Sequence, residues 1–161
     1  MLIDTHLHLV NRMQIRYPWL AGAPALDRDW TYEAYEKAAK RLGITHALHM
    51  EVDVAPDDIS VENGLIGDLM AQDGSLMCGA ISAARPENEG FETFLEGLDL
   101  SLIKGIRRIL HESANDLSQS ALFRSNIALL GKHKLPFDLC VLARQLDVAT
   151  QLVDACEGTP Q

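Results

Sequence analysis

Strand-like apolar runs and helical segments alternate five times along this 161-residue chain. The runs at 76–81 and 137–141 are almost continuously apolar, which is typical of parallel strands that are covered on both faces. Apolar residues at helical spacing follow the runs, and a helix is the usual crossover between two parallel strands. The alternation therefore predicts an α/β fold with a mainly parallel sheet.

The boundaries of these elements follow from local signals. Thr31 can cap a helix that ends before Gly43, a residue that readily adopts the left-handed conformation of a helix end. No linker-like change in composition interrupts the series, so one domain is expected. The predicted strands are 2–5, 44–52, 76–82, 102–110 and 136–142, and the predicted helices are 31–42, 61–72, 91–98, 122–134 and 146–156.

Two architectures fit five successive β-α units: an open doubly wound sheet and part of an eight-fold barrel. The doubly wound fold favours a glycine-rich phosphate loop after the first strand, and the sequence has none, so no nucleotide cofactor is expected. The first loop instead offers two histidines and an aromatic segment, which suits the mouth of a barrel. Because eight units need about 250 residues, residues 1–161 are predicted to form a single incomplete (β/α)8 TIM-like barrel domain whose C-terminal part is absent.

Charge and cysteine content exclude several classes of function. The net charge is −9, whereas binding to nucleic acid needs clustered Lys and Arg. No apolar run approaches the ~18 residues of a transmembrane helix, so no membrane partner is expected. The cysteines, Cys78, Cys140 and Cys156, are odd in number and lack zinc-site spacing, which predicts reduced and mostly buried thiols in a cytoplasmic protein.

His6 and His8 stand one residue apart at the end of the first predicted strand. Alternate side chains of an extended strand point to the same face, so the two imidazoles should project together. Such a pair can bind a divalent cation, or hold a water and polarise a substrate carbonyl. The alternative is that the histidines only make hydrogen bonds at a strand end. Their position before a long polar and aromatic loop favours the functional interpretation.

Five groups of residues stand out in order along the chain: Ile3-Asp4-Thr5-His6-Leu7-His8, Arg16-Tyr17-Pro18-Trp19-Leu20, His49-Met50-Glu51, Lys104-Gly105-Ile106-Arg107-Arg108-Ile109-Leu110, and Phe137-Asp138-Leu139 with Gln145-Leu146. This ordered set resembles one family, the amidohydrolase-related hydrolases of amidohydrolase family 2. Within it, the chain is similar to the branch of sugar lactonases and dicarboxylate-lactone hydrolases, some of which need no metal. The resemblance implies a distorted β/α barrel with its site at the carboxyl-terminal mouth.

The resemblance implies roles for particular residues. His6 and His8 match the first-strand pair, which acts in catalysis and binds a divalent metal such as zinc where one is used. Arg107 or Arg108 matches an arginine that meets a substrate carboxylate or carbonyl oxygen. The two point to opposite sides of a regular strand, and Arg107 is favoured.

Four further residues are candidates for substrate binding. Tyr17 and Trp19 match a loop that caps the substrate, or else they form a hydrophobic staple over the barrel. Glu51 alternates with His49 near the end of the second predicted strand; the shared face could look into the barrel, or the two could be a charged pair at a strand rim. His111 follows the fourth strand, where it could line the mouth or simply be solvated. Cys140 has no neighbouring base in the sequence, which predicts an inert thiol.

The sequence departs from the family in one respect. The family continues with a histidine on strand six and an aspartate on strand eight, the expected general base, and neither lies within these 161 residues. The leading hypothesis is a hydrolase of a lactone or related C–O bond in a small sugar acid or carboxylic acid. The alternatives are a zinc-dependent decarboxylase of the same superfamily, and an inactive or split-protein fragment. The chain alone is expected to be inactive and either to self-associate or to need its missing C-terminal half.

Overall fold

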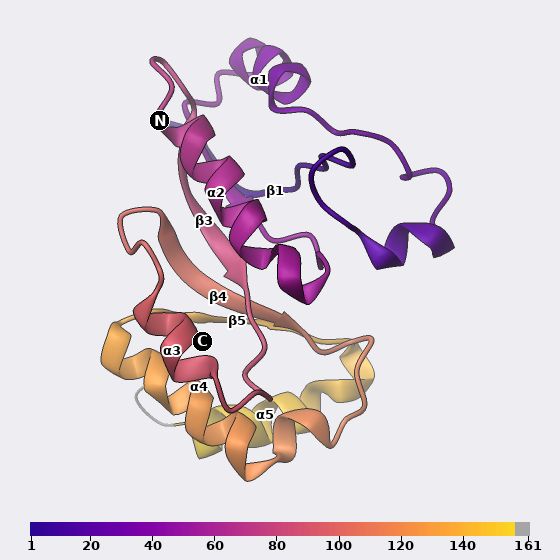
Figure 1. The fold of residues 1–161 in the computed structure, drawn as a ribbon, viewed down its shortest axis with the longest axis vertical. Helices are drawn as coiled ribbons and strands as arrows, with labels where there is room; N and C mark the ends of the chain where they lie inside the picture. The colour runs from indigo at the N-terminus through magenta and orange to yellow at the C-terminus, as the bar shows by residue number, and fades with distance from the viewer. Residues whose placement is uncertain (157–161) are drawn as a thin grey trace. The chain divides into compact units, whose positions relative to one another are not determined.

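The computed structural model describes residues 1–156 (Figure 1). The chain divides into two compact units. Unit 1 comprises Met1–Ala83 with Ser101–Ile103, and unit 2 comprises Ala84–Leu100 with the chain from Lys104 onward. Strands and helices alternate in both, which confirms the predicted α/β class. Within residues 1–156, no helix is long and apolar enough to cross a membrane.

Unit 1 contains three parallel strands in the order β1, β2, β3. Strand β1 continues to Leu7, two residues beyond the prediction, because Leu7 still pairs with His49 of the neighbouring strand. Two α-helices and two short 3-10 helices complete the unit. The elements are β1 (Ile3–Leu7), η1 (Pro18–Gly22), α1 (Tyr32–Arg41), β2 (His46–Met50), η2 (Pro56–Asp58), α2 (Ile59–Met70) and β3 (Met77–Ala83).

The ends of α1 are set by the residues that the sequence indicated. The side chain of Thr31 accepts a hydrogen bond from the backbone N–H of Ala34, which satisfies a free donor of the first turn. Gly43 follows the helix with φ +75°, a conformation that costs little without a Cβ atom. Local sequence therefore determines where α1 begins and ends.

Unit 2 contains the parallel pair β4–β5 and three α-helices, and Figure 1 shows α4 and α5 on the same side of that pair. The first residue of β4, Ile103, is counted with unit 1. The elements are α3 (Phe91–Glu96), β4 (Ile103–Ile109), η3 (Leu117–Gln119), α4 (Ala121–His133), β5 (Phe137–Cys140), η4 (Ala143–Gln145) and α5 (Leu146–Ala155).

Aromatic side chains form the centre of the core of unit 2. Phe123 of α4 and Phe137 of β5 are fully buried, with ring centroids 6.2 Å apart and ring planes almost perpendicular. Ser120 accepts a hydrogen bond from the N–H of Phe123 and so fixes the start of α4. Lys134, predicted as the last helical residue, instead closes α4 in the left-handed conformation with φ +56°. This turn brings the chain back toward β5.

Candidate functional site

Strand β1 brings the two predicted histidines together. His6 lies within β1 and His8 follows its last residue, Leu7. The two Nε2 atoms are 3.1 Å apart, and the ring planes are almost perpendicular, with centroids 4.8 Å apart. Both side chains are exposed in the structure. The expectation that alternate strand positions place these imidazoles side by side is therefore confirmed.

The backbone of β2 determines the proton positions in this pair. His8 Nδ1 lies 2.9 Å from the carbonyl oxygen of Met50. A carbonyl oxygen can only accept, so Nδ1 of His8 carries the proton and Nε2 of the neutral ring presents a lone pair. The 3.1 Å contact then requires Nε2–H of His6 to donate to Nε2 of His8. A backbone carbonyl thus orients one imidazole with its free nitrogen toward the other.

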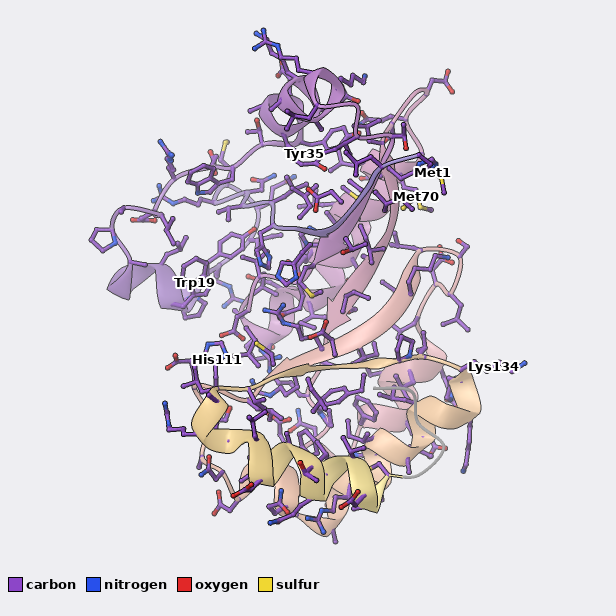
Figure 2. All side chains as sticks on the ribbon, turned by 180° about the vertical axis from the view of Figure 1, so that it is seen from behind. Met1, Trp19, Tyr35, Met70, His111 and Lys134 are labelled. Carbon is purple, nitrogen blue, oxygen red and sulfur yellow. The ribbon has the colours of Figure 1, made fainter. Side chains whose placement is uncertain are left out.

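Asp4 supports the pair from the same strand. One of its oxygens accepts a hydrogen bond from the backbone N–H of His6, and the other accepts from the hydroxyl of Tyr35. Tyr35 projects from α1, as Figure 2 shows, so this bond ties α1 to β1. Burial and the bond to Asp4 together raise the pKa of Tyr35 well above its ordinary value. Tyr35 therefore remains a neutral donor, and Asp4 remains occupied by these two contacts.

The geometry of the histidine pair fits two positions of a zinc site. Zn–N bonds of about 2.0–2.1 Å at a tetrahedral angle place two ligand nitrogens about 3.3–3.4 Å apart, close to the 3.1 Å between the Nε2 atoms of His6 and His8. The Met50 carbonyl would serve as the outer partner that metal-bound histidines usually have. Among residues 1–156, no group of three or more His, Cys, Asp or Glu side chains could hold a metal. The described residues therefore supply two metal ligands, His6 and His8, which are only part of the ligand set of a zinc site.

His49 faces α2 rather than the barrel interior. Its Nε2 lies 3.3 Å from Oε1 of Glu62, and the side chains are only 2% and 3% exposed. Glu51 turns toward its own loop, where its carboxylate accepts a hydrogen bond from the N–H of Asp53. The expected shared face of His49 and Glu51 toward the barrel interior is thus not formed by His49. The functional role suggested for Glu51 stays a prediction.

Sequence reasoning overlooked Glu62, although a signal for it exists. Glu62 lies on the apolar stripe of α2, four residues before Ile66 and seven before Leu69. A carboxylate at that spacing is buried and needs a partner. Its Oε1 accepts hydrogen bonds from His49 and from the backbone N–H of Val52.

The aromatic loop after β1 is anchored by polar contacts. The hydroxyl of Tyr17 accepts a hydrogen bond from the N–H of Asn11, and burial raises the pKa of Tyr17 to about 12. The indole of Trp19, labelled at η1 in Figure 2, donates to the carbonyl of Val52 at 2.8 Å. The first contact braces the loop internally, and the second ties it to the segment that follows β2. Whether Tyr17 and Trp19 also contact substrate stays a prediction.

An ion pair fastens the base of the same loop. The guanidinium of Arg16 donates to both carboxylate oxygens of Asp58 at 2.8–2.9 Å, and the backbone N–H of Arg16 donates to Oδ2 of Asp58. The hydrogen bonds from Arg16 lower the pKa of Asp58 below its ordinary value. The loop is therefore joined to η2 by three hydrogen bonds on one carboxylate.

The other predicted site residues, Arg107 and His111, belong to unit 2. Arg108 forms an ion pair with Glu87 at 2.9 Å, whereas Arg107 is the more deeply buried of the two, at 7% exposure. This difference in burial and in partner agrees with the expectation that the neighbouring arginines of β4 point to opposite sides of the strand. Arg107 remains the candidate for substrate contact.

His111, labelled in the loop after β4 in Figure 2, lies next to a cysteine. Its Nδ1 is 3.2 Å from Sγ of Cys140, and its Nε2 is 3.5 Å from Oε1 of Glu112. No signal in the sequence indicates this contact, because only the pairing of β4 with β5 brings residues 111 and 140 together. All three cysteines are free thiols as predicted, but only Cys156 is buried, and Cys78 and Cys140 are half-buried.

Comparison with solved structures establishes the fold. An amidohydrolase from Burkholderia multivorans with bound zinc is 18% identical with a TM-score of 0.81, and covers 98% of this chain and 55% of its own. Amidohydrolase 2 from Bifidobacterium longum subsp. infantis is 22% identical with a TM-score of 0.73, and the match covers 98% of this chain and 58% of that protein. A probable 2-pyrone-4,6-dicarboxylic acid hydrolase from Acinetobacter baumannii, with citric acid bound, is 14% identical with a TM-score of 0.72. The match covers 94% of this chain and 54% of that protein.

These likenesses confirm the predicted fold class, a partial β/α barrel, over the open doubly wound alternative. The chain spans little more than half the length of the solved structures that it matches. No match was found among curated proteins. The family model Amidohydro_2, described as amidohydrolase, matches residues 3–160, which is nearly the whole sequence. The chain therefore belongs to the amidohydrolase family represented by that model.

Proposed function

We propose that the protein containing this chain hydrolyses a lactone or a related C–O bond in a small sugar acid or carboxylic acid. The observation that carries this proposal is the His6–His8 pair, whose Nε2 atoms lie 3.1 Å apart with the tautomer of His8 held by Met50. Membership of the amidohydrolase family supports hydrolysis as the reaction. Similarity to proteins described as 2-pyrone-4,6-dicarboxylic acid hydrolases supports a lactone that carries carboxylate groups.

Lactone hydrolysis needs a polarised carbonyl, a positioned water and a base that takes its proton. Nε2–H of His6 can donate to a carbonyl oxygen when substrate replaces the contact between the imidazoles. Nε2 of His8 can accept a hydrogen bond from the attacking water, because Met50 keeps the proton on Nδ1. A divalent metal held by the same two nitrogens would require His6 to carry its proton on Nδ1 instead of Nε2, and it would supply Lewis acidity and lower the pKa of a bound water. The general base expected from the family resemblance is an aspartate that these 161 residues do not include.

Arg107 is the proposed contact for a substrate carboxylate or carbonyl oxygen. A guanidinium presents two parallel donors that match a carboxylate, and burial strengthens such a pair. The neighbouring Arg108 is engaged by Glu87. An Arg107→Lys substitution keeps the positive charge but loses the two parallel donors of the guanidinium, so we expect KM to rise about tenfold. Arg108→Lys is the matched control and should leave KM within about twofold.

Four other residues are proposed to line the substrate site: Tyr17, Trp19, Glu51 and His111. Hydrogen bonds to Asn11 and Val52 hold the side chains of Tyr17 and Trp19 in place, so this loop can form a rigid wall of the substrate site. We propose a small-molecule substrate as the partner on which the reaction takes place. The 161-residue chain alone is expected to lack turnover and to self-associate or to need a C-terminal second half.

The second candidate function is a zinc-dependent decarboxylase of the same superfamily. The spacing of the two Nε2 atoms favours it, because that spacing is close to the distance between two nitrogens on one zinc ion. The similar amidohydrolase from Burkholderia multivorans also contains bound zinc. The two candidates differ in product, since a decarboxylase releases carbon dioxide and a lactonase releases an acid.

One experiment on the complete protein separates these functions. The protein, before and after removal of metal with a chelator, is mixed with 2-pyrone-4,6-dicarboxylate and with a panel of sugar lactones. Acid release is followed with a pH indicator, carbon dioxide by gas analysis, and metal content by mass spectrometry. We expect one proton per ring opened and no carbon dioxide. Carbon dioxide release in step with retained zinc would overturn the lactonase proposal.

A further inference from the structure

Unit 2 contains a cluster of three titratable side chains at the ends of its paired strands. Cys140 is the last residue of β5, and His111 and Glu112 lie in the loop after β4. Sγ of Cys140 is 3.2 Å from Nδ1 of His111, and Nε2 of the same ring is 3.5 Å from Oε1 of Glu112. A nucleophile within hydrogen-bond reach of a base, with a third group beside that base, is the arrangement that activates a cysteine.

The sheet and one buried side chain hold this cluster in place. Ile109 pairs with Cys140 across β4 and β5, and the backbone N–H of Leu110 donates to the carbonyl of Cys140 at 3.0 Å. Gln145 is only 3% exposed, and its amide donates at 3.2 Å to the carbonyl of Leu110, directly before His111. The contact between the thiol and the imidazole therefore rests on a rigid scaffold.

The positions of the protons favour transfer from the sulfur to the ring. The carboxylate of Glu112 can only accept, so it favours the proton on Nε2 of the neutral ring of His111. Nδ1 then presents a lone pair to the thiol of Cys140 and can take its proton. The carboxylate on one side and the thiolate on the other stabilise the imidazolium that results. Cys140 thus has a base that its own segment of the sequence does not supply.

The other two cysteines provide an internal comparison. Sγ of Cys78 donates to the carbonyl of Ala47 at 3.3 Å, and Sγ of Cys156 donates to the carbonyl of Arg124 at 3.6 Å. A carbonyl oxygen does not take the proton of a thiol, so both contacts keep the sulfur protonated. Burial also raises the pKa of Cys156. Cys78 is half-buried like Cys140, so these two thiols differ in the neighbour of the sulfur rather than in exposure.

The exposure of the cluster favours a small reactant. Cys140 is half-buried, and the side chain of His111 is 30% exposed. Oxidation of a cysteine follows the thiolate character of its sulfur and the access to it. A hydroperoxide is compact and uncharged and can reach a half-buried sulfur, whereas exchange with a bulky disulfide needs more open access.

We propose that Cys140 is a modification site for hydroperoxides, with His111 as the base that ionises its thiol. Nδ1 of His111 takes the thiol proton, and the thiolate sulfur attacks one oxygen of hydrogen peroxide, so that an S–O bond forms and the O–O bond breaks. The departing hydroxide takes the proton from the imidazolium and leaves as water. The sulfur loses two electrons, the peroxide gains them, and Cys140 becomes a sulfenic acid. This step does not depend on the proposed hydrolysis, because no lactone takes part in it.

The test traps the sulfenic acid in the complete protein. The protein is treated with hydrogen peroxide and an excess of dimedone, which adds to sulfenic acids, and the adducts are followed by peptide mass spectrometry. Trypsin separates the three cysteines, because Lys134 and Arg144 flank Cys140. At pH 6 an ordinary thiol, with a pKa of about 8.5, is less than about 1% ionised, so we expect Cys140 to be labelled at least about tenfold faster than Cys78. Labelling of Cys78 as fast as that of Cys140, or no label on Cys140, would overturn the proposal.

A pH series separates activation by the imidazole from simple access. Between pH 6 and pH 8 the rate at Cys78 should rise about tenfold per pH unit as its thiol ionises. The rate at Cys140 should rise by less than about threefold over the whole range, because the imidazole already takes the proton at pH 6. An equal rise for both cysteines would contradict the role given to His111.

Two variants locate the base. His111→Gln removes the proton acceptor and should slow the labelling of Cys140 at pH 6 at least about tenfold. His133→Gln, at the end of α4 in the same unit, is the matched control and should leave that rate within about twofold. Circular dichroism checks that both variants fold, and if His111→Gln does not, the comparison of Cys140 with Cys78 decides. An unchanged rate at Cys140 in a folded His111→Gln variant would overturn the proposal.

Discussion

The buried pair of His49 and Glu62 should be a major determinant of the stability of unit 1. Oε1 of Glu62 accepts one hydrogen bond from His49 and one from the N–H of Val52, and both side chains of the pair are almost fully buried. Glu62→Ala leaves both of these donors without an acceptor. A buried donor without a partner costs about 1–3 kcal/mol, so the two together predict a loss of about 2–6 kcal/mol.

The free energy of unfolding is measured by urea titration followed by circular dichroism, with wild type and variant at the same protein concentration. Asp68→Ala, an exposed position on the same helix, is the matched control and should change it by less than about 0.5 kcal/mol. A double-mutant cycle with His49→Ala then isolates the pair, with an expected coupling of about 1–3 kcal/mol. A loss below about 1 kcal/mol for Glu62→Ala, or a coupling near zero, would refute this reasoning.

Three further predictions concern other parts of the chain. Phe137→Ala removes a fully buried ring that packs against Phe123 and should lower the free energy of unfolding, measured by urea titration, by about 3–5 kcal/mol. Leu146→Ala, at an exposed position, should lower it far less, and similar values for both variants would contradict the described core. Iodoacetamide should alkylate Cys140 beside His111 faster than Cys156, whose pKa is raised by burial, as measured by peptide mass spectrometry, and His111→Ala should reduce that advantage. Because Arg16 lowers the pKa of Asp58, their contact should stabilise the fold at pH values above the ordinary aspartate pKa of about 3.9, and this stabilisation should be lost as the pH falls through the lower pKa that Asp58 has in the folded state. The free energy of unfolding, measured from pH 2 to pH 6, should therefore depend less on pH in Asp58→Asn, and an unchanged pH dependence would exclude this contribution.

The sequence predicted elements whose signals are local. Thr31 and Gly43 mark the ends of α1 because a cap and a left-handed residue act within one turn of the helix. The contact between His6 and His8 also followed from local geometry, since alternate residues of a strand share a face. Even there, the hydrogen bond from His8 to Met50, which determines the tautomer, was outside the reach of sequence analysis, because it joins residues 42 positions apart.

The contacts that the sequence did not indicate are long-range. Glu62 was passed over because a single carboxylate on an apolar stripe does not show which strand residue it will meet, and that residue is His49. His111 and Cys140 meet only through the pairing of β4 with β5. A regular strand suggested a common face for His49 and Glu51, but Glu51 lies beyond the last residue of β2 and bonds to its own loop. Burial and strand pairing, rather than residue spacing, determine these parts of the structure.

The most direct test of the proposed site is the kinetic effect of removing one imidazole of the pair. In the complete protein, kcat/KM for the best lactone substrate is compared between wild type, His8→Ala and His46→Ala. His46 is an exposed histidine on β2 whose ring contacts only the neighbouring Thr45 among the hydrogen bonds described for it, so it is the matched control. We predict a loss of at least about 100-fold for His8→Ala, a typical contribution of a positioned catalytic group, and less than about twofold for His46→Ala. Equal activity of the two variants would contradict the central claim that the His6–His8 pair forms part of the hydrolytic site.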